Sequence, residues 1–364
     1  MRINIIGAGP AGTYLGYLLA QKGHIVKIFE RDREIGKPVQ CTGILSDYFK
    51  KLMMPQEDFV LNTVDTTRIY APNREFVDTK IKKNYVICRK KFDSYLAKEA
   101  EEAGAKIFLE HSFKSFARKG NRIITIVSHN GKPTIYECDI LIGADGPLSE
   151  VAKSAGLFGK RKFLIGTQIE ASKSNDNVVE FYPYIGNYAW IVPVNSNTVR
   201  IGVAAYKSSQ DLFKKFAKEK LGEYSKITLE NQSGVIPVFD PFVKVQAGNV
   251  YLIGDAATFN KATSGGGINQ ALKAAVILSD CIENNLDYNL EWKRHLFLEL
   301  YLHLTLHRMM TRFKESDWNN LIRSFSEEKM KSILFSESRD KLFKMCIKIG
   351  YTKPSLLTYI RFLL

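Results

Sequence analysis

The sequence predicts an α/β fold, α+β overall, with a Rossmann-like parallel-sheet domain, an interleaved mixed-sheet domain and a helical C-terminal region. Three observations predict it. The chain opens with a strand, a glycine-rich turn, a helix and a second strand over residues 2–30. Two later buried strands, at 139–144 and 249–253, end in turns that contain Gly and Asp. Between 163 and 245 the pattern is alternating and aromatic, which is typical of strands.

The first thirty residues form a βαβ unit with the pattern Gly-x-Gly-x-x-Gly at its first turn. In this motif the first glycine makes the tight turn, the second lets the backbone approach a pyrophosphate, and the third lets the helix pack on the strand. The helix N-terminus attracts phosphate, and Glu30 is placed to accept a ribose hydroxyl. The alternative is a glycine turn that binds nothing. The predicted dinucleotide site consists of Gly7, Gly9, Pro10, Ala11, Gly12, Glu30 and Arg31.

Composition limits the class of protein. The chain has 364 residues, of which 45% are hydrophobic and 25% charged, which suits a soluble globular protein of two or three domains. The net charge of +14 favours an anionic partner, such as a phosphate-bearing cofactor, anionic lipid or nucleic acid. A generally basic surface without a specific partner explains the charge equally well. Nucleic acid is the least favoured of these partners, because the basic residues are spread out and no nucleic-acid-binding motif is present.

Cysteine usage and hydropathy indicate the compartment. The five cysteines are scattered, odd in number and form no Cys-x-x-Cys pair, so we expect a reducing cytoplasm and no metal site. The chain starts with a strand rather than a charged and then apolar leader, so no secretory signal is expected. No apolar run reaches the roughly 18 residues of a spanning helix. Any membrane contact is therefore expected to be peripheral, on the inner face of the cell membrane.

The remaining elements follow in order. Short helices are expected at 47–54 and 149–155, and longer ones at 89–103, 210–220 and 267–283; strands at 85–88, 105–109, 113–119, 122–129 and 134–138; a hairpin at 66–71 and 75–79; and several amphipathic helices from 290 onwards. These elements group into a nucleotide-binding domain (1–62, 84–160 and 246–285), a second, antiparallel-sheet domain (63–83 and 161–245) and a C-terminal helical region (286–364).

Two further motifs point to the cofactor. Leu141–Gly146 and Leu252–Ala257 each carry Gly and Asp at the end of a strand. Either one alone is as easily a turn. Together with the N-terminal unit they resemble the FAD-dependent oxidoreductases of the p-hydroxybenzoate hydroxylase type, over about residues 1–285. That resemblance implies FAD as cofactor and implies contacts to it from Arg89, Asp145, Gly146, Gly254, Asp255 and Ala256.

Three more segments narrow the resemblance. They are Gly36–Gly43, Asn260–Ile268 and Tyr188–Pro193, and they are similar to the geranylgeranyl reductase family. Two positions depart from the family pattern: Ala262 replaces a proline and Val192 replaces a phenylalanine. Both departures concern the substrate side. The resemblance implies an FAD-dependent reductase that saturates isoprenoid double bonds, those of archaeal-type membrane ether lipids in this case.

The residue types in these segments suit a flavin. Gly265, Gly266 and Gly267 let the backbone lie against a flat ring, and the helix that starts at Ile268 directs its positive end at the ring. The resemblance places Cys41 beside the flavin and facing the substrate cavity. A lone cysteine is otherwise a small buried hydrophobe, and alternating aromatic residues are otherwise core. The predicted catalytic residues are Cys41 and Gly43, and the predicted substrate-binding residues are Tyr182, Tyr188, Trp190 and Pro193.

The expected reaction transfers hydride from N5 of reduced flavin to one alkene carbon while a proton reaches the other. A dry, aromatic-walled cavity suits the cationic character that develops. The sequence has no second Gly-x-Gly-x-x-Gly unit for a nicotinamide, which fits the superfamily that it resembles and also allows ferredoxin. The expected electron donor is ferredoxin or NAD(P)H. The segment 356–364 has one charge, Arg361, and either docks on an anionic membrane or caps the nucleotide domain.

Two other functions remain open at this point. One is an FAD-dependent monooxygenase of the same fold, which would oxidise NADPH rapidly and form peroxide or a hydroxylated product. The Cys41–Gly43 and Ser264–Ile268 segments argue against it. The other is a non-enzymatic prenyl-binding protein, which would be colourless when purified. The intact flavin motifs argue against that function.

Overall fold

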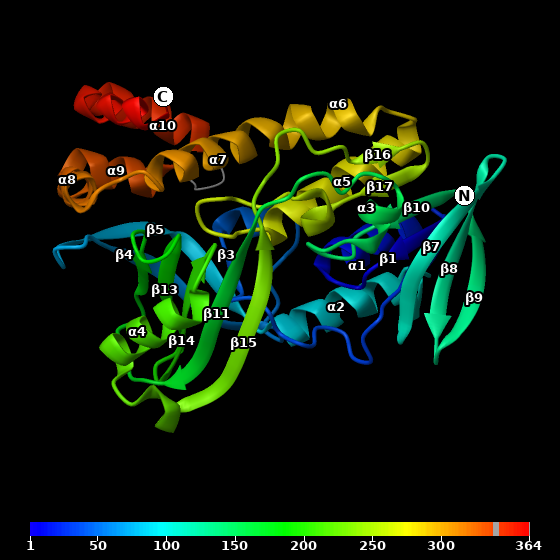
Figure 1. Cartoon of the computed structure of the whole chain (residues 1–364), viewed down its shortest axis with the longest axis horizontal. Helices are drawn as coiled ribbons and strands as arrows, with labels where there is room; N and C mark the ends of the chain where they lie inside the picture. Colours follow the sequence, from blue (N-terminus) through cyan, green and yellow to red (C-terminus); the bar gives the residue numbers. More distant parts are fainter. Residues whose placement is uncertain (338–341, 364) are drawn as a thin grey trace.

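The computed structural model describes residues 1–337 and 342–363. A six-stranded sheet forms the centre of the N-terminal domain (Figure 1). Its order is β16 (Gln246–Ala247), β17 (Val250–Leu252), β10 (Ile140–Gly143), β1 (Arg2–Ile6), β2 (Ile25–Phe29) and β6 (Lys106–Phe108), and every pairing is parallel except the β16–β17 pair. The predicted parallel sheet is therefore confirmed, and it places the ends of β1, β10 and β17 side by side.

Helices cover this sheet as the βαβ pattern requires. They are α1 (Pro10–Gln21), α2 (Arg89–Glu102), α3 (Glu150–Ser154) and α5 (Ile268–Asn284). Helix α1 packs against both α2 and α5. The central strands are rich in β-branched residues such as Ile3 and Ile5, which are completely buried, and Leu15 of α1 is buried with them. Removing this apolar surface from water stabilises the domain and fixes α1 over the strand ends.

An eight-stranded sheet lies beside this domain. Its order is β15 (Thr228–Pro237), β11 (Phe163–Ser172), β14 (Thr198–Ala205), β13 (Tyr188–Asn195), β12 (Val179–Tyr182), β4 (Val60–Tyr70), β5 (Phe76–Ile87) and β3 (Ile44–Leu45). The β12–β4 pair is parallel and the other pairs are antiparallel. Helix α4 (Ser209–Leu221) covers one face of the sheet. The opposite face turns towards the segments around Gln40 and Gly265.

The hairpin of β4 and β5 differs from expectation in its length. Residues 85–88 were expected to form a separate strand, but β5 runs without a break from Phe76 to Ile87. The polar stretch Lys80–Asn84 hid this continuity, because it has too few apolar residues to indicate a strand. The predicted domain limits at 62/63 and 83/84 therefore fall inside β4 and β5.

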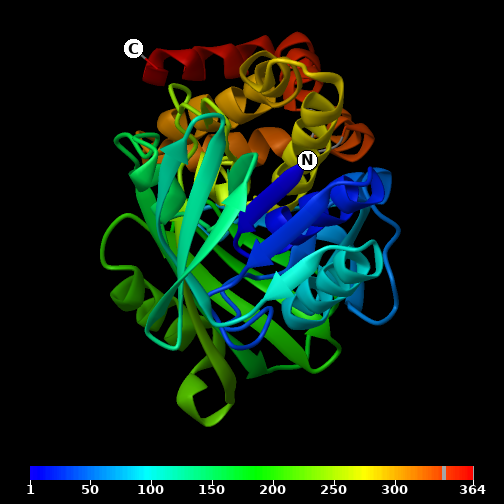
Figure 2. The ribbon, with the colours of Figure 1, turned by 90° about the vertical axis from the view of Figure 1, so that its right-hand side faces the viewer.

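A smaller sheet of β7 (His111–Lys119), β8 (Arg122–His129) and β9 (Lys132–Cys138) stands at the far end of the molecule, in front in Figure 2. Asn130 and Gly131 join β8 to β9, and both have positive φ (51° and 76°). That geometry is the two-residue hairpin turn that an Asn-Gly pair favours. The predicted strands and their turn are confirmed.

The C-terminal region is helical, as expected, and lies above both larger sheets (Figures 1 and 2). It comprises α6 (Tyr288–Trp292), a π-helical turn (Lys293–Phe297), α7 (Leu298–Met310), α8 (Glu315–Phe325), α9 (Glu328–Ser336), α10 (Leu342–Thr352) and a 3-10 helix (Pro354–Leu363). Trp292 is fully buried against Phe259 and anchors this layer on the N-terminal domain. Leu364 of the predicted last segment lies outside the described residues. Within residues 1–337 and 342–363, no helix has the length and apolar character to cross a membrane.

Candidate active site

The first glycine turn has the geometry that the motif predicts. Gly7 has a φ of +104°, and a Cβ there would lie 2.4 Å from the Ala144 carbonyl oxygen. A Cβ on Gly12 would lie 2.0 Å from the Gly7 oxygen, so helix and strand meet only if both residues are glycine. A Cβ on Gly9 would meet no atom within 4 Å. The turn is closely packed at Gly7 and Gly12 and has open space at Gly9. Pro10 and Ala11 begin α1 beside this space, and the helix N-terminus presents free N–H groups there.

Glu30 follows strand β2, and its carboxylate is held by the backbone. One oxygen accepts a hydrogen bond from the Ala8 amide at 2.7 Å, and the other accepts from the Asp32 amide at 3.0 Å. Each oxygen keeps a second lone pair for an outside donor. Arg31, next in the chain, is exposed and close to Asp32. Glu30 is therefore fixed beside the opening above Gly9, as a ribose acceptor requires.

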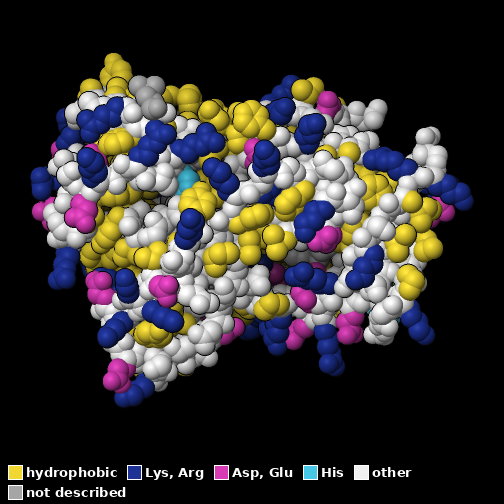
Figure 3. Space-filling model, in the orientation of Figure 1, with side chains coloured by type: hydrophobic (Ala, Val, Ile, Leu, Met, Phe, Trp, Pro, Cys, Tyr) yellow, Lys and Arg dark blue, Asp and Glu magenta, His cyan; other side chains and the backbone are white. Residues whose placement is uncertain are grey.

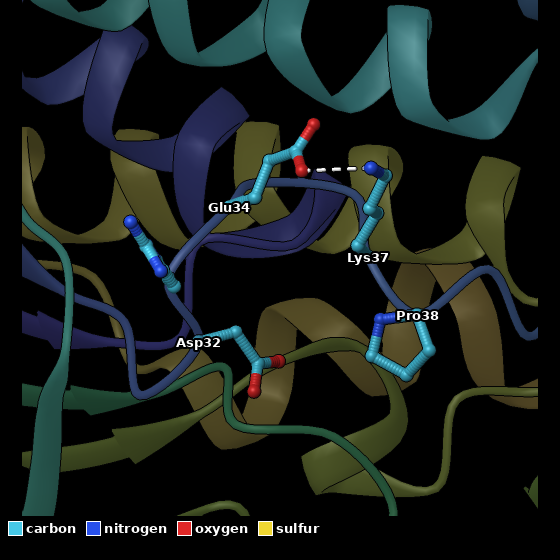
Figure 4. Close-up of a pocket in the computed structure, with 5 residues that line it drawn as sticks. Asp32, Glu34, Lys37 and Pro38 are labelled. Carbon is cyan, nitrogen blue, oxygen red and sulfur yellow. Dashed lines mark ion pairs between the residues drawn. The ribbon is translucent and has the colours of Figure 1, made fainter.

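A pocket of about 480 Å³ opens beside this strand end (Figure 4). Glu34 and Lys37 lie on one side of its loop and form an ion pair of 2.8 Å, while the side chains of Asp32 and Pro38 point to the other side. The volume lies within the range of cofactor and ligand pockets. The lining residues belong to the loop that connects Glu30 to Cys41.

Two aspartates end neighbouring strands of the parallel sheet. Asp145 follows β10, and its carboxylate accepts hydrogen bonds from the Ser149 hydroxyl at 2.5 Å and from the Val151 amide at 3.1 Å. It therefore ties down the start of α3. Burial raises the pKa of Asp145, and these two hydrogen bonds oppose that change. Gly146, also predicted to contact the cofactor, has a φ of +79° and open space at its Cβ position.

Asp255 follows β17 in a different setting. Gly254 has a φ of +59°, and a Cβ there would lie 3.0 Å from the Ala11 Cβ. The start of α1 and the Gly-Asp turn, which continues into Ala256, are thus in contact. A Cβ on Gly267 would lie 3.1 Å from the Asp255 Oδ1 atom, so Asp255 lies at the start of α5. Burial raises its pKa to about 6, although Asn260 and two arginines act in the opposite direction.

Arg89 begins α2, and its guanidinium is directed inward. It donates to both oxygens of Asp93, at 2.9 and 2.8 Å, across one helical turn. Burial alone would lower the pKa of Arg89, but Asp93 and the nearby Cys41 thiol outweigh it and raise the pKa. Arg89 is also one of the cations that oppose the pKa rise of Asp255. A permanent positive charge is therefore held close to both Cys41 and Asp255.

Arg161 is a functional candidate that the sequence did not reveal. Its guanidinium donates to three carbonyl oxygens: Phe158 at 2.8 Å, Pro147 at 3.2 Å and Ala256 at 2.8 Å. Pro147 and Ala256 belong to the two aspartate turns, so Arg161 holds these turns together. Burial lowers its pKa, and three aspartates act against that change. No sequence signal marked Arg161, because it stands between two lysines in what reads as a solvated basic run.

The segment that carries Cys41 is pressed onto the eight-stranded sheet. The Cys41 sulfur accepts a hydrogen bond from the Gly43 amide at 3.4 Å. The Thr42 hydroxyl donates to Gln168 at 2.8 Å, and the Thr42 carbonyl oxygen accepts from Arg200 at 2.8 Å. Gly43 has a φ of +71°, and a Cβ there would lie 2.6 Å from a backbone oxygen of β5. The contribution of Gly43 is therefore its conformation, which positions Cys41.

The sequence analysis also missed two residues that hold the Cys41 segment on the eight-stranded sheet. Arg200 is buried in β14, where it forms an ion pair of 3.0 Å with Glu170. Gln168 of β11 accepts the indole N–H of Trp190 at 3.0 Å as well as the Thr42 hydroxyl. A single arginine within the apolar stretch Thr198–Ala205 was the available signal. The role of this arginine could not be inferred without knowing that the Cys41 segment packs on β14.

Tyr188 and Trp190 lie on the face that carries the Cys41 segment. A Cβ on Gly265 would lie 2.3 Å from the Tyr188 hydroxyl oxygen, so this oxygen reaches the glycine-rich turn. That hydroxyl is buried and has no hydrogen-bond partner among the described residues. Burial raises the pKa of Tyr188, and the nearby Cys41 thiol adds to the rise. The Trp190 ring packs against Gly202, where a Cβ would lie 2.3 Å from it.

Tyr182 and Pro193 lie on the opposite face, so the structure does not bring them to this site. Strand pairing places Tyr182 opposite Ala189, on the side of α4. The Tyr182 ring stacks on Tyr70 at 4.5 Å and contacts Phe216 of α4. Pro193 shares the parity of Ala189 along β13, and it pairs with a residue of the same core. Neighbouring aromatic residues in sequence alternate between faces, which separates Tyr182 from Tyr188.

The turn at Gly265–Gly267 leads into α5 as expected, with Ile268 as the first residue of the helix. Unpartnered polar atoms lie in the first turn of α5. Both amide atoms of Gln270 and the Oδ1 atom of Asn269 are buried and have no hydrogen-bond partner among the described residues. Buried polar groups are almost always paired, so unpartnered ones at a helix N-terminus fit a bound polar group.

Comparison with known proteins gives the cofactor and the family. Residues 1–286 match the FAD binding domain family. The digeranylgeranylglycerophospholipid reductase of Methanocaldococcus jannaschii is 29% identical over 99% of this chain and 97% of its own. Digeranylgeranylglycerophospholipid reductase 2 of Methanosphaera stadtmanae is 31% identical over 75% of each chain.

Two solved structures have the same fold. A geranylgeranyl bacteriochlorophyll reductase-like protein from Thermoplasma acidophilum superimposes with a TM-score of 0.87 at 20% identity, and covers 100% of this chain and 99% of that chain. A flavin-dependent halogenase superimposes with a TM-score of 0.70 at 15% identity, over 98% of this chain and 78% of that chain. At these identities they show the fold alone.

The residues present fit FAD. The open position above Gly9 and the free N-terminus of α1 suit a pyrophosphate, and the fixed carboxylate of Glu30 suits a ribose. Asp255, Gly267 and the unpartnered amide of Gln270 suit the other end of the cofactor. The family model over residues 1–286 supports FAD as the cofactor. The chain belongs to the geranylgeranyl reductase family and is an FAD-dependent oxidoreductase.

Proposed function

We propose that the chain saturates carbon–carbon double bonds of geranylgeranyl chains in archaeal-type membrane ether lipids, with the hydride supplied by N5 of reduced FAD. The observation that carries this proposal is the meeting of Tyr188, Cys41 and Gly265 on one face of the eight-stranded sheet. The names of the two reductase relatives support the substrate class.

An isolated alkene is a poor hydride acceptor, so the site must stabilise the positive charge that develops on it. Phe181, Tyr188 and Trp190 provide aromatic faces: the Phe181 and Tyr188 rings lie 6.0 Å apart, and the Tyr188 and Trp190 rings 5.8 Å apart. Aromatic faces attract cations, and the exclusion of water strengthens that attraction. This wall orients the prenyl chain and keeps the site dry.

The second alkene carbon needs a proton. Two groups on this face carry an exchangeable proton: the Tyr188 hydroxyl, which lies beside Gly265, and the Cys41 thiol, which lies near Tyr188. The raised pKa of Tyr188 keeps that proton in place at neutral pH. The Tyr188 hydroxyl is the proposed donor because it is unpartnered among the described residues. Cys41, held by Gly43, is the proposed group that orients the alkene.

Reduced ferredoxin or NAD(P)H is the proposed source of electrons. The chain has one Gly-x-Gly-x-x-Gly unit, and the FAD site accounts for it. A nicotinamide donor would therefore bind without a Rossmann unit of its own. Comparing the rate of flavin reduction by each donor in the absence of oxygen distinguishes them.

The test uses FAD-loaded protein, reduced chemically without oxygen. Three substrates are supplied separately: a geranylgeranylated glycerophospholipid, geranylgeranyl diphosphate and a prenylated quinone. The proposal expects the phospholipid to gain mass in steps of one hydrogen pair. A mass gain on the quinone or the free diphosphate alone would reassign the substrate. Peroxide or a hydroxylated product in air, with no mass gain without oxygen, would favour a monooxygenase.

A further inference from the structure

Helix α10 carries an apolar stripe that faces outward. Phe343, Ile347 and Tyr351 are spaced by four residues, so they share one side of the helix. Their exposed fractions are 44%, 54% and 91%. Large apolar side chains scattered singly on a surface need no explanation. Three such side chains on one side of a helix do need an explanation.

The opposite side of α10 accounts for its attachment to the protein. Leu342 and Met345 are buried in a small core with Met330 and Ile333 of α9. Helix α10 is therefore apolar on two sides. The buried side explains how the helix is held, and the exposed side has no role in that packing.

The 3-10 helix that follows also carries an exposed apolar stripe, with the three-residue spacing of a 3-10 helix. Leu357, Ile360 and Leu363 are spaced by three residues, which places them on one side of a 3-10 helix. Their exposed fractions are 51%, 52% and 39%. Leu357 lies against Gly350, because a Cβ there would be 3.2 Å from Leu357 Cδ2. The two stripes therefore adjoin, and together we call them the C-terminal apolar surface.

This surface lies in the outermost layer of the molecule. Figure 1 shows α10 and the end of the chain above α8 and α9, away from both larger sheets. In Figure 3, hydrophobic side chains alternate with Lys and Arg side chains over the same region. Contiguous exposed apolar patches with polar rims mark interaction sites.

The sequence that forms the surface is basic. The stretch 342–363 contains four basic residues and no acidic one: Lys344, Lys348, Lys353 and Arg361. Three of these form ion pairs with acids of neighbouring segments, at Glu337, Glu327 and Asp317. Lys344 stands directly after Phe343 on α10. Apolar side chains flanked by basic ones suit the headgroup region of an anionic bilayer.

We propose that the C-terminal apolar surface docks the chain on an anionic lipid bilayer, with both helices lying in the plane of the headgroups. A second copy of the chain would fit less well, because each copy carries a net charge of +14 and like charges would meet. The proposed contact is peripheral, because both helices lie along the bilayer surface and do not cross it. The inference rests on this surface and does not depend on the reaction proposed above.

The test is co-sedimentation of the full FAD-loaded chain with vesicles of phosphatidylglycerol or of phosphatidylcholine. We expect at least about tenfold stronger partitioning onto phosphatidylglycerol, weakened by salt. The variant F343S/I347S/Y351S should lose about tenfold or more. The matched control I135S/L229S/F242S alters three side chains that are also exposed, at 65%, 60% and 87%, but lie on other elements, and it should bind as wild type does.

Three outcomes would overturn the proposal: equal binding of the stripe variant and wild type, no binding by wild type, or equal loss in the control. Sedimentation velocity without lipid tests the second-copy explanation, which a wild-type dimer and a monomeric stripe variant would establish. FAD content and melting temperature show whether each variant is folded. If the triple variant is not, L357S/I360S probes the same surface from the other helix.

Discussion

Asp145 and Asp255 end neighbouring strands of one parallel sheet, and their sequence contexts are similar, yet their surroundings differ. Both oxygens of Asp145 are engaged by the first turn of α3. Asp255 lies at the start of α5, where burial raises its pKa to about 6 and Asn260 and two arginines oppose that rise. The first carboxylate is engaged by the start of a helix, whereas the second lies beside the unpartnered polar atoms of α5 and is the one that we assign to the cofactor. Two similar strand-end motifs can therefore have different roles, and the hydrogen-bond partners of each aspartate show which role it has.

Arg161 gives the largest expected effect, because it connects the two aspartate turns. Arg161→Met removes three hydrogen bonds from a charged donor and leaves buried carbonyl groups unpaired. We expect a loss of about 3–4 kcal/mol in the free energy of unfolding, measured by urea denaturation of the apoprotein. The matched control Arg122→Met alters an exposed arginine and should leave the free energy of unfolding close to that of wild type. An unfolding free energy like that of wild type for Arg161→Met would contradict the bridging role.

Asp255→Ala tests the carboxylate assigned to the cofactor. A hydrogen bond to a charged group contributes about 1.5–3 kcal/mol, so FAD should bind roughly 10- to 100-fold more weakly. Fluorescence titration of the apoprotein with FAD measures this. Asp145→Ala serves as the comparison, and its affinity for FAD should change less than about threefold. If the two variants weaken FAD binding equally, the distinction between the two aspartates is wrong.

The pH dependence of apoprotein stability tests the burial of Asp255 in another way. The folded-state pKa of Asp255 is raised from its ordinary 3.8 to about 6, so its protonated form is favoured in the folded state. Its contribution is fully present below about pH 4 and is lost as the pH rises through 6. Relative to Asp255→Asn, wild type should lose about 1–3 kcal/mol between pH 4 and pH 8. Parallel stability curves for the two proteins would show that Asp255 does not titrate in this range.

Asp145→Ala has the smallest expected effect. It removes acceptors at the start of a short helix, which costs about 1–2 kcal/mol in unfolding free energy. Asp145→Asn should recover part of that loss, because the amide oxygen can still accept a hydrogen bond. Thermal unfolding of the two apoprotein variants provides the measurement. A full loss in both variants would indicate that charge, rather than hydrogen bonding, is what α3 requires.

The sequence predicted the parts of the site whose chemistry is local. The first glycine turn, the two strand-end aspartates and the glycine entry to α5 each carry their signal within ten residues. The packing at Gly7 and Gly12 has the predicted form, because those contacts are made within one βαβ unit. The FAD cofactor followed from the glycine turn and the two aspartate motifs, and the family followed from Gly36–Gly43, Asn260–Ile268 and Tyr188–Pro193. The comparisons confirmed both.

The remaining parts depend on contacts between distant segments. Arg161 looks like one of three consecutive basic residues, and only the fold shows that it reaches both aspartate turns. Tyr182 and Tyr188 belong to one aromatic cluster in sequence, but strand register places them on opposite faces. Local alternation shows that two faces exist. It does not show which face meets the flavin, because that depends on what packs over the sheet.

The most direct test of the central claim is a single-turnover titration without oxygen. FAD-loaded protein is fully reduced, mixed with a geranylgeranylated glycerophospholipid, and followed by flavin absorbance and product mass together. The account predicts one saturated double bond for each flavin reoxidised, and it predicts that Tyr188→Phe slows this step while Tyr182→Phe, altered on the far face, does not. Flavin that stays reduced in the presence of the lipid, or that is reoxidised only by oxygen, would contradict it.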